Sequence, residues 1–339
     1  MGEPIKVVVT DYIEADLEWE AAELAKRGVR FECHQLKGAT EDEVIARTRD
    51  ADVVVVNMVK ITPAVISGWE RCRLVIRHGA GYDNLDVPAL TAAGIVAEYV
   101  PDYCRDEVAE HAIALLFACA RKVVWSRKVL DDSVARGEWD FRPVVPMFRL
   151  AGTTLGIVGC GRIGSAVLEK LRHFGMKFLI CDPYLSPRRR DDLDIETVSL
   201  ETVLRGSDFV TLHTPLNNET RYLMNARTIA MMKPSAYLIN CSRGGMVHTG
   251  DLRDALLAGT IAGAAIDVYE KEPPRPDYPL LGLDNVVLTP HLSWYSKDAE
   301  RTIREKILQD ITMFLDGAGP RIPINPEVLQ GRKETRRHG

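Results

Sequence analysis

The sequence predicts an α/β protein built on parallel sheets. Short apolar runs alternate with helix-like segments over most of the 339 residues, which is typical of parallel strands joined by helical crossovers rather than of a sandwich or a bundle. The chain is also too long for one ordinary hydrophobic core. A second series of alternating segments begins at residue 151. We therefore expect two domains, each with a doubly wound parallel sheet.

The first third of the chain supplies the strands of one unit. Helix-like segments separate most of its apolar runs, so this part could form a doubly wound sheet by itself. The strands are expected at 7–9, 29–33, 53–56, 74–76 and 94–97.

One long helix is expected next, over residues 107–130. Its apolar residues fall on a common stripe, and the charged Glu110 and Arg121 lie roughly opposite that stripe. We expect this helix to join the two domains or to pack against a partner subunit.

The second series of elements holds most of the remaining chain. A final helix is expected near residues 298–315, after which the pattern fades. The strands of this series are expected at 154–158, 177–181, 208–212, 236–240, 264–268 and 286–289.

Composition excludes several classes of function. A formal net charge of −5 argues against broad nucleic-acid binding, although residues 331–339 are locally basic and are expected to form a disordered, solvated tail. The seven cysteines are scattered without a C-x-x-C pair, which indicates neither a disulfide framework nor a metal cage. No apolar stretch is long enough to span a membrane. We expect a cytoplasmic protein that binds no metal, membrane or nucleic acid.

The most informative segment is TLGIVGCGRIG at 154–164. An apolar strand here meets glycines spaced for a tight turn and a helix start, where side chains at Gly159 and Gly161 would block the approach of a diphosphate to the backbone. Gly164 would let the helix pack closely on the strand. The segment predicts a dinucleotide site, with Arg162 and Ile163 opening the helix.

An acidic residue ends the next strand. Asp182 follows Gly164 by eighteen residues, where a carboxylate can accept hydrogen bonds from the adenosine ribose and so favours NAD over NADP. A solvated turn residue before Pro183 is the alternative interpretation. The arginines at 188–190 could accept a 2′-phosphate instead, but Asp182 would repel that group, and we expect NAD.

Three later strands end in polar side chains that suit a 2-oxo acid. Arg243 would supply a planar cation for the carboxylate, His291 would move the proton of the carbonyl oxygen, and Glu272 would favour the charged histidine. Taken singly, each could be a surface charge, a loop acid or a capped histidine. Their joint occurrence at successive strand ends, downstream of a nucleotide motif, favours catalysis.

His213 is the other candidate for acid–base chemistry, since it also ends a strand. We expect it to line the cofactor site with Thr214 and Pro215, and Cys241 and Ser242 to do so after a later strand. The other histidines lack comparable company in the sequence: His34, His78, His111, His173, His248 and His338.

These motifs resemble the D-isomer-specific 2-hydroxyacid dehydrogenases, over about residues 50–325. The matching segments are RHGAGYDN at 77–84, VPDY at 100–103, the glycine segment, MKP at 232–234, NCSRGG at 240–245, DVYEKEP at 267–273 and TPH at 289–291.

The resemblance implies a Rossmann coenzyme domain at 101–295 and a discontinuous, flavodoxin-like substrate domain at 1–100 and 296–330, with a cleft between them. It implies a catalytic set of Arg243, Glu272 and His291, and a homodimer. It also implies that Asp267 holds the nicotinamide amide, although Asp267 could be a plain strand-end residue. The backbone amides of Gly79, Ala80 and Gly81 would bind the substrate carboxylate, although this loop could be only a turn.

The segment after His291 resembles one branch of the family, which contains the C-terminal-binding-protein corepressors and phosphoglycerate-dehydrogenase-like members. Trp294 could wall the substrate pocket and favour an apolar or thioether-bearing acid, or could be a buried packing residue. We expect an oxidoreductase that transfers a hydride between NAD(H) and a D-2-hydroxy acid and its 2-oxo partner. The alternative is an NAD(H)-sensing, dimeric corepressor-like binding protein.

Overall fold

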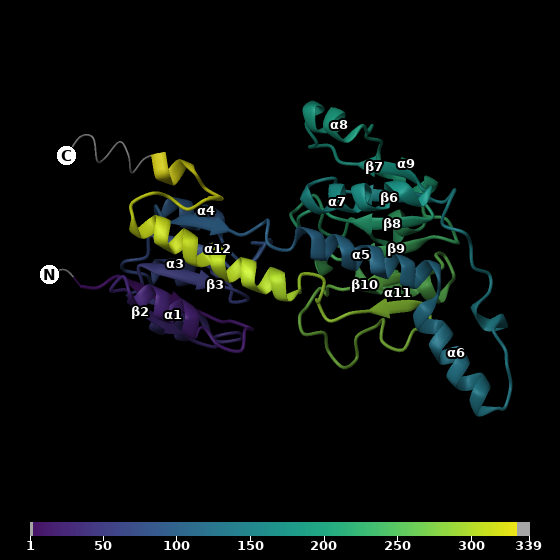
Figure 1. Cartoon of the computed structure of the whole chain (residues 1–339), viewed down its shortest axis with the longest axis horizontal. Helices are drawn as coiled ribbons and strands as arrows, with labels where there is room; N and C mark the ends of the chain where they lie inside the picture. Colours follow the sequence, from purple (N-terminus) through teal and green to yellow (C-terminus); the bar gives the residue numbers. More distant parts are fainter. Residues whose placement is uncertain (1–2, 331–339) are drawn as a thin grey trace. The chain divides into compact units, whose positions relative to one another are not determined.

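The computed structural model describes residues 3–330, and these divide into two compact units (Figure 1). The first unit contains residues 3–103 and 296–330, and the second contains residues 104–295. The chain therefore passes between the units at 103/104 and again at 295/296. The tail expected at 331–339 lies outside the described residues.

The first unit is built on a five-stranded sheet in the order β2-β1-β3-β4-β5, whose paired strands all run parallel. This order is that of flavodoxin-like folds. The strands are β1 (Lys6–Val9), β2 (Arg30–Cys33), β3 (Val53–Val56), β4 (Leu74–Arg77) and β5 (Val96–Tyr99). The helices are α1 (Glu18–Ala25), α2 (Glu41–Thr48), α3 (Pro63–Ser67), α4 (Val87–Ala92) and α12 (Lys297–Leu315).

Helices cover both faces of this sheet, because successive strand residues point to opposite sides. In β3, Val54 packs with the apolar residues of α2, α3 and α4, whereas Val55 packs with those of α1 and α12. The final helix of the chain thus completes a core begun by the first hundred residues.

The second unit is built on a six-stranded sheet in the order β11-β10-β9-β8-β6-β7, again with parallel pairing. Its strands are β6 (Thr154–Val158), β7 (Lys177–Cys181), β8 (Phe209–Leu212), β9 (Tyr237–Asn240), β10 (Gly263–Ile266) and β11 (Val286–Leu288). The strand order reverses beside β6, since β7 lies on one side of it and β8 on the other. In open α/β sheets, ligands bind outside the carboxyl ends of the strands at such a point.

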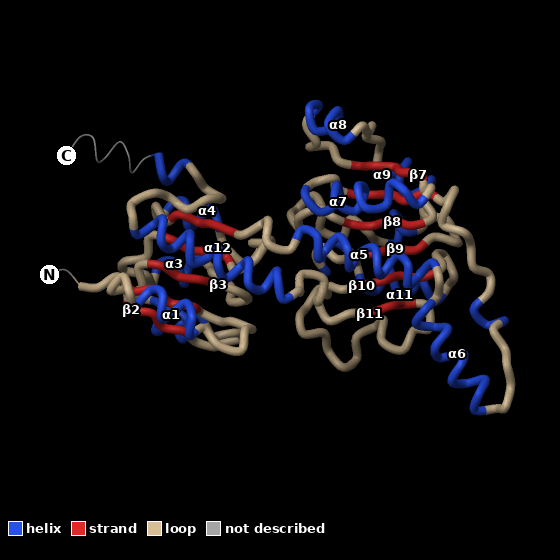
Figure 2. Tube along the Cα trace, in the orientation of Figure 1, coloured by secondary structure: helices blue, strands red, loops and turns tan. Residues whose placement is uncertain are grey.

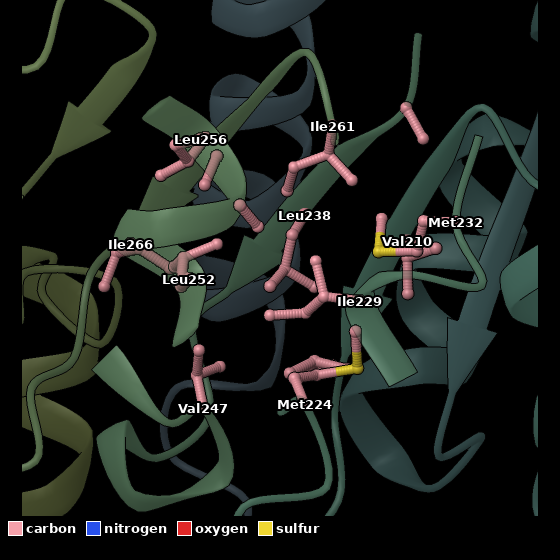
Figure 3. Packing of buried hydrophobic residues seen from close by; sticks show 14 of the residues in the cluster. Val210, Met224, Ile229, Met232, Leu238, Val247, Leu252, Leu256, Ile261 and Ile266 are labelled. Carbon is pink, nitrogen blue, oxygen red and sulfur yellow. The ribbon is translucent and has the colours of Figure 1, made fainter. Parts of the chain in front are cut away.

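The second sheet is also covered on both faces. Alternate residues of β8, β9 and β10 pack with α9, α10 and α11 in one apolar cluster, part of which is seen in Figure 3. Helices α5 and α7 contact each other and the sheet but contribute no residue to that cluster, so they cover the opposite face. The helices are α5 (Arg105–Ala120), α6 (Val123–Ala135), α7 (Arg162–Leu171), α8 (Pro187–Leu193), α9 (Leu200–Gly206), α10 (Ala226–Ile229) and α11 (Thr249–Leu257).

The predicted α/β class with parallel sheets is confirmed, but the single long helix at 107–130 is wrong. Two helices occupy this region, and α6 leaves the line of α5 in Figure 2. Lys122 between them has a left-handed backbone with φ of 51°, which interrupts the helical hydrogen-bond ladder. The apolar stripe did not reveal the break, because the stripe continues across it.

Candidate functional site

The turn after β6 accepts only glycine at two positions. Gly159 has a φ of +89°, and a Cβ atom there would lie 2.7 Å from Thr214 Cγ2 and 2.8 Å from the His213 carbonyl carbon. A Cβ atom on Gly164 would lie 2.0 Å from the Gly159 carbonyl oxygen. The glycines therefore allow β6, the loop after β8 and the start of α7 to approach each other closely.

Space remains where an anionic group would bind. A Cβ atom on Gly161 would meet nothing within 4 Å, and Gly161 caps α7 without any side-chain hydrogen bond to the helix. The first N–H groups of a helix lack partners within it, and they attract anions together with the helix dipole. Arg162 and Ile163 form the first turn of α7, so this end of the helix fits a dinucleotide diphosphate.

Asp182 ties this turn to the end of β7. One carboxylate oxygen accepts a hydrogen bond from the Cys160 N–H at 2.8 Å, and the other accepts one from the Tyr184 N–H at 3.0 Å. Asp182 is half-buried, so it is reachable from solvent. Nearby, Arg189 donates to the Ser165 hydroxyl at 3.2 Å. The Asp182 carboxylate thus has a structural role in addition to any contact with a ribose.

The His213 ring is set up to stay neutral. Its Nε2 lies 2.9 Å from Thr211 Oγ1, and its Nδ1 is a buried atom with no hydrogen-bond partner among residues 3–330. Burial lowers the pKa of His213 to about 4. A neutral ring with an unused nitrogen suits a polar group of a bound ligand better than proton transfer near neutral pH.

Several of the expected cofactor residues lie in loops at the carboxyl ends of β8 and β9. Ser242 donates its hydroxyl to the Thr214 carbonyl oxygen at 2.5 Å, which joins the two loops. Cys241 is buried beneath them, and Pro215 is exposed.

His291 and Glu272 form a direct pair. His291 Nδ1 lies 2.7 Å from Glu272 Oε2, and the two side chains are 35% and 29% exposed. The other Glu272 oxygen accepts the Tyr269 N–H at 3.0 Å. Because one carboxylate oxygen is anchored on the backbone, Glu272 fixes the orientation of the ring and leaves Nε2 as the nitrogen that can face a substrate.

Arg243 completes this group. Burial would raise the pKa of Glu272, but the hydrogen bond and charge of His291 and the charge of Arg243 outweigh it, and the pKa lies below its usual value. The loop that carries Arg243 is fixed by Asn240, whose Nδ2 donates to the Arg243 carbonyl oxygen at 2.9 Å. The structure thus pairs His291 with Glu272 and places Arg243 in a loop at the same edge of the second sheet, where its charge acts on Glu272 and its Nη1 donates to the Ser242 carbonyl oxygen at 2.9 Å.

Asp267 lies beneath the His291 loop and is fully buried. Its Oδ1 accepts hydrogen bonds from the Thr289 hydroxyl at 2.5 Å and from the Leu292 N–H at 2.9 Å, and its Oδ2 accepts the Ser293 N–H at 3.0 Å. The sequence indicated a polar strand end here but not these bonds. A contact of Asp267 with the nicotinamide amide stays a prediction.

The remaining expected site residues are divided between the units. Gly79, Ala80 and Gly81 follow β4 in the first unit, where Gly79 has a φ of +146° and a Cβ atom would collide with the Arg77 guanidinium. Trp294 belongs to the second unit and packs edge-on against Tyr295, with ring centroids 5.3 Å apart.

Among the histidines that lacked company in the sequence, His78 and His111 meet partners from distant segments of the chain. His78 Nε2 lies 3.2 Å from Glu14 Oε1, and His111 Nε2 lies 3.1 Å from Thr289 Oγ1. The second contact joins residues 178 positions apart, so no local pattern could reveal it. In the sequence, Thr289 was marked only by its position two residues before His291, and nothing near His111 pointed to the contact.

The described residues contain neither a membrane-spanning helix nor a cluster of metal ligands. No helix within residues 3–330 is long and apolar enough to cross a membrane. No group of three or more His, Cys, Asp or Glu residues in the same range could hold a metal ion. None of the seven cysteines, all of which lie within residues 3–330, forms a disulfide bond.

The chain is similar to proteins named glyoxylate reductase and D-3-phosphoglycerate dehydrogenase. Glyoxylate reductase of Korarchaeum cryptofilum is 39% identical over 296 residues, which cover 85% of this chain and 87% of that protein. D-3-phosphoglycerate dehydrogenase of Methanocaldococcus jannaschii is 36% identical over 92% of this chain, but the match spans only 58% of that protein's length.

The fold has counterparts among solved structures. The structure of D-lactate dehydrogenase from Aquifex aeolicus, complexed with NAD and lactic acid, superposes with a TM-score of 0.81 and is 27% identical; the match covers 96% of this chain and 98% of that one. Residues 113–293, which contain the glycine turn, Asp182 and the His291 group, match the family model of the D-isomer specific 2-hydroxyacid dehydrogenase, NAD binding domain. With its sheet order, its glycine turn and these relatives in agreement, the chain belongs to the D-isomer specific 2-hydroxyacid dehydrogenase family.

Proposed function

We propose that the protein is an NAD-dependent D-2-hydroxyacid dehydrogenase that interconverts a D-2-hydroxy acid and the corresponding 2-oxo acid. The observation that carries this proposal is the 2.7 Å contact between His291 and Glu272, with Arg243 close enough to lower the pKa of the carboxyl. This group combines a proton donor, a carboxylate to stabilise its charged form and a cation for the substrate carboxylate.

Each side chain has a distinct task in 2-oxo acid reduction. The Arg243 guanidinium binds the substrate carboxylate and polarises the carbonyl group. His291 donates a proton from Nε2 to the carbonyl oxygen, and Glu272 stabilises the imidazolium at Nδ1. In the reverse direction, neutral His291 accepts the hydroxyl proton. The bound NAD(H) supplies or accepts the hydride.

The first unit would serve as the substrate domain. We assign the amides of Gly79, Ala80 and Gly81 to the substrate carboxylate and Trp294 to the wall of a pocket for an apolar substrate side chain. The cofactor would lie at the carboxyl ends of the second sheet, in the domain expected at 101–295, and Asp182 would select NAD.

The coenzyme assignment has a matched pair of test variants. Gly159 and Gly152 both have a φ of +89°, but a Cβ atom on Gly152 would meet nothing within 4 Å. Gly159→Ala should weaken NADH binding by about 10-fold or more, whereas Gly152→Ala should leave the Kd nearly unchanged, since both share the same backbone strain. Fluorescence titration with NADH measures both; equal affinities would contradict the placement of the coenzyme.

We propose that two copies of the chain form a homodimer through the exposed apolar surface of the second unit. Val134 at the end of α6 is 60% exposed, and Trp139 and Phe141 after it are 83% and 65% exposed. Exposed apolar surface of this extent on neighbouring residues is typical of a protein interface. Light scattering should give twice the chain mass, and Val134→Asp with Trp139→Ser should give the monomer; a wild-type monomer would refute the proposal.

Activity with a panel of acids tests the proposed function. NADH oxidation is followed with glyoxylate, hydroxypyruvate, phosphohydroxypyruvate, pyruvate and longer apolar 2-oxo acids. Turnover with at least one of them, abolished by His291→Ala, supports the proposal. Absence of turnover with all, together with NADH-dependent peptide binding, would instead favour the corepressor-like alternative, for which the similar dehydrogenases and reductases provide no support.

A further inference from the structure

The loop that carries His291 is held by a series of hydrogen bonds centred on the buried Asp267. His291 has a φ of +54°, a left-handed backbone that non-glycine residues rarely adopt. Its N–H donates to the Asp267 carbonyl oxygen at 2.8 Å, and the next two N–H groups, of Leu292 and Ser293, donate to the Asp267 carboxylate. Asp267 thus holds three successive backbone groups and maintains a conformation that His291 would not favour alone.

The series of hydrogen bonds continues from Asp267 to His111 in helix α5. The Thr289 hydroxyl donates its only proton to Asp267 Oδ1 at 2.5 Å. His111 Nε2 lies 3.1 Å from the same hydroxyl oxygen, which can then act only as an acceptor toward the ring. His111 must therefore carry its proton on Nε2, and the bonds run in one direction from His111 through Thr289 to Asp267.

The two ends of this series of hydrogen bonds lie near the points where the polypeptide enters and leaves the second unit. His111 is in α5, the first helix after the crossing at 103/104, and the His291 loop ends at the crossing at 295/296. The hydrogen bonds therefore connect the entry helix of the unit to its exit loop. His111 Nε2 also lies 3.6 Å from Asp267 Oδ1 itself, so α5 meets the Asp267 carboxylate both directly and through Thr289.

We propose that His111 is a positioning residue which, through Thr289 and Asp267, fixes the backbone of residues 291–293 and thereby the direction of the His291 ring. The proposal rests on the proposed function only in that His291 is taken as the proton donor. Burial by itself would raise the pKa of Asp267, but the hydrogen bonds from Thr289, Leu292 and Ser293 lower it, so the carboxylate that anchors the loop stays charged. Neither His111 nor Thr289 needs to touch substrate.

Two matched pairs of variants test the proposal. Thr289→Val keeps the shape of the side chain but removes the hydroxyl, and Thr289→Ser keeps the hydroxyl. His111→Leu removes the N–H donor, and His111→Gln restores one at a similar reach. Each disruptive variant should lower kcat by about 10-fold or more, because small misplacements of a catalytic group are costly. Its conservative partner should recover most of this loss, and the Kd for NADH should stay within about 2-fold in all four.

A readout without turnover separates this inference from the proposed function. In the protein without substrate, the ¹H–¹³C signal of the His291 ring, assigned by its loss in His291→Ala, should shift in Thr289→Val and His111→Leu and return in Thr289→Ser and His111→Gln. If wild type shows no turnover with any acid, the proposed function fails and this shift still supports the positioning role. An unchanged His291 signal in both disruptive variants overturns the inference, as does a raised Kd for NADH with kcat unchanged, since Thr289 would then act on the coenzyme instead.

Discussion

Each unit contains a histidine–carboxylate pair near the carboxyl ends of its strands, and the two pairs differ mainly in burial. In the first unit, His78 and Glu14 lie 3.2 Å apart and are 10% and 2% exposed. In the second unit, His291 and Glu272 lie 2.7 Å apart and are 35% and 29% exposed. The same two residue types therefore form an almost completely buried pair in the first unit and a partly exposed pair in the second.

The difference in burial reverses the electrostatic outcome. In the first unit, burial and the charge of Arg77 lower the pKa of His78 to about 3, and burial raises the pKa of Glu14. In the second unit, the hydrogen bond and charge of His291 hold the pKa of Glu272 below its usual value. Desolvation disfavours both charges of a buried pair, whereas partial exposure allows them to stabilise each other. Burial therefore opposes charge on the first pair, whereas in the second pair the pKa of the carboxyl lies below its usual value.

The largest effect is expected at His291. His291→Ala removes the proton donor and should lower kcat by about 10²- to 10⁴-fold, with NADH binding nearly unchanged. Steady-state kinetics and NADH titration measure the two quantities. His173→Ala, a change at an exposed histidine of the same unit, is the control. Turnover that survives in His291→Ala would contradict the assignment.

A smaller loss is expected when Glu272 loses its charge. Glu272→Gln deprives the charged imidazole of its partner, so kcat/KM for 2-oxo acid reduction should fall by about 10- to 100-fold. The loss should deepen as the pH rises, because the charged histidine is then harder to maintain. Glu270→Gln, at an exposed position of the same loop, is the control. A loss that is equal at pH 5.5 and pH 8 would show that Glu272 only fills space.

The buried pair should affect stability rather than catalysis. The folded protein keeps His78 uncharged down to a pKa of about 3, whereas the unfolded chain takes up the proton near its ordinary pKa of about 6.5. The contribution of neutral His78 to the free energy of unfolding is therefore full above pH 6.5. It is lost as the pH falls, by at most about 1.4 kcal/mol per pH unit. His78→Gln should thus gain stability relative to wild type as the pH is lowered.

Urea unfolding at pH 7.5 and pH 5 measures this effect as a difference between the two proteins. The raised pKa of Glu14 changes the free energy of unfolding with pH in the opposite direction, and it does so in both wild type and His78→Gln. The difference between the two proteins therefore isolates the contribution of His78. His173→Gln is the surface control. A constant difference between His78→Gln and wild type at both pH values would mean that His78 titrates normally in the folded state.

A further effect on stability is expected at a buried carboxyl that has no histidine partner. Burial, followed by the negative charge of Asp310, raises the pKa of Glu98 to about 9. Because the folded state favours the protonated form, its contribution to stability is full below pH 4.5 and is lost as the pH rises toward 9. Glu98→Gln cannot ionise, so its unfolding midpoint should decline less between pH 6 and pH 9 than that of wild type. Glu305→Gln, on the exposed side of α12, should behave as wild type.

Local sequence predicted the parts of the site that depend on neighbours in the chain. The spacing of Gly159, Gly161 and Gly164 predicted the turn, because Gly164 packs on the Gly159 carbonyl within one strand–turn–helix segment. The close contact of Gly159 with the loop after β8 is not local and came only from the fold. Arg243 and His291 were found because parallel strands bring their carboxyl ends to one edge of a sheet. The partners of His78 and His111 were missed, since each is contributed by a distant segment.

The sequence by itself therefore determined the α/β class, the coenzyme turn and the residue types of the catalytic group, because alternation and glycine spacing are short-range properties of the chain. Only the tertiary structure decided which histidine–carboxylate pair is buried, where the helix breaks at Lys122, and that Asp267 and Thr289 meet His111 and the backbone of the His291 loop. Burial and hydrogen bonding between distant segments set these outcomes, and neither is encoded in any short stretch of sequence.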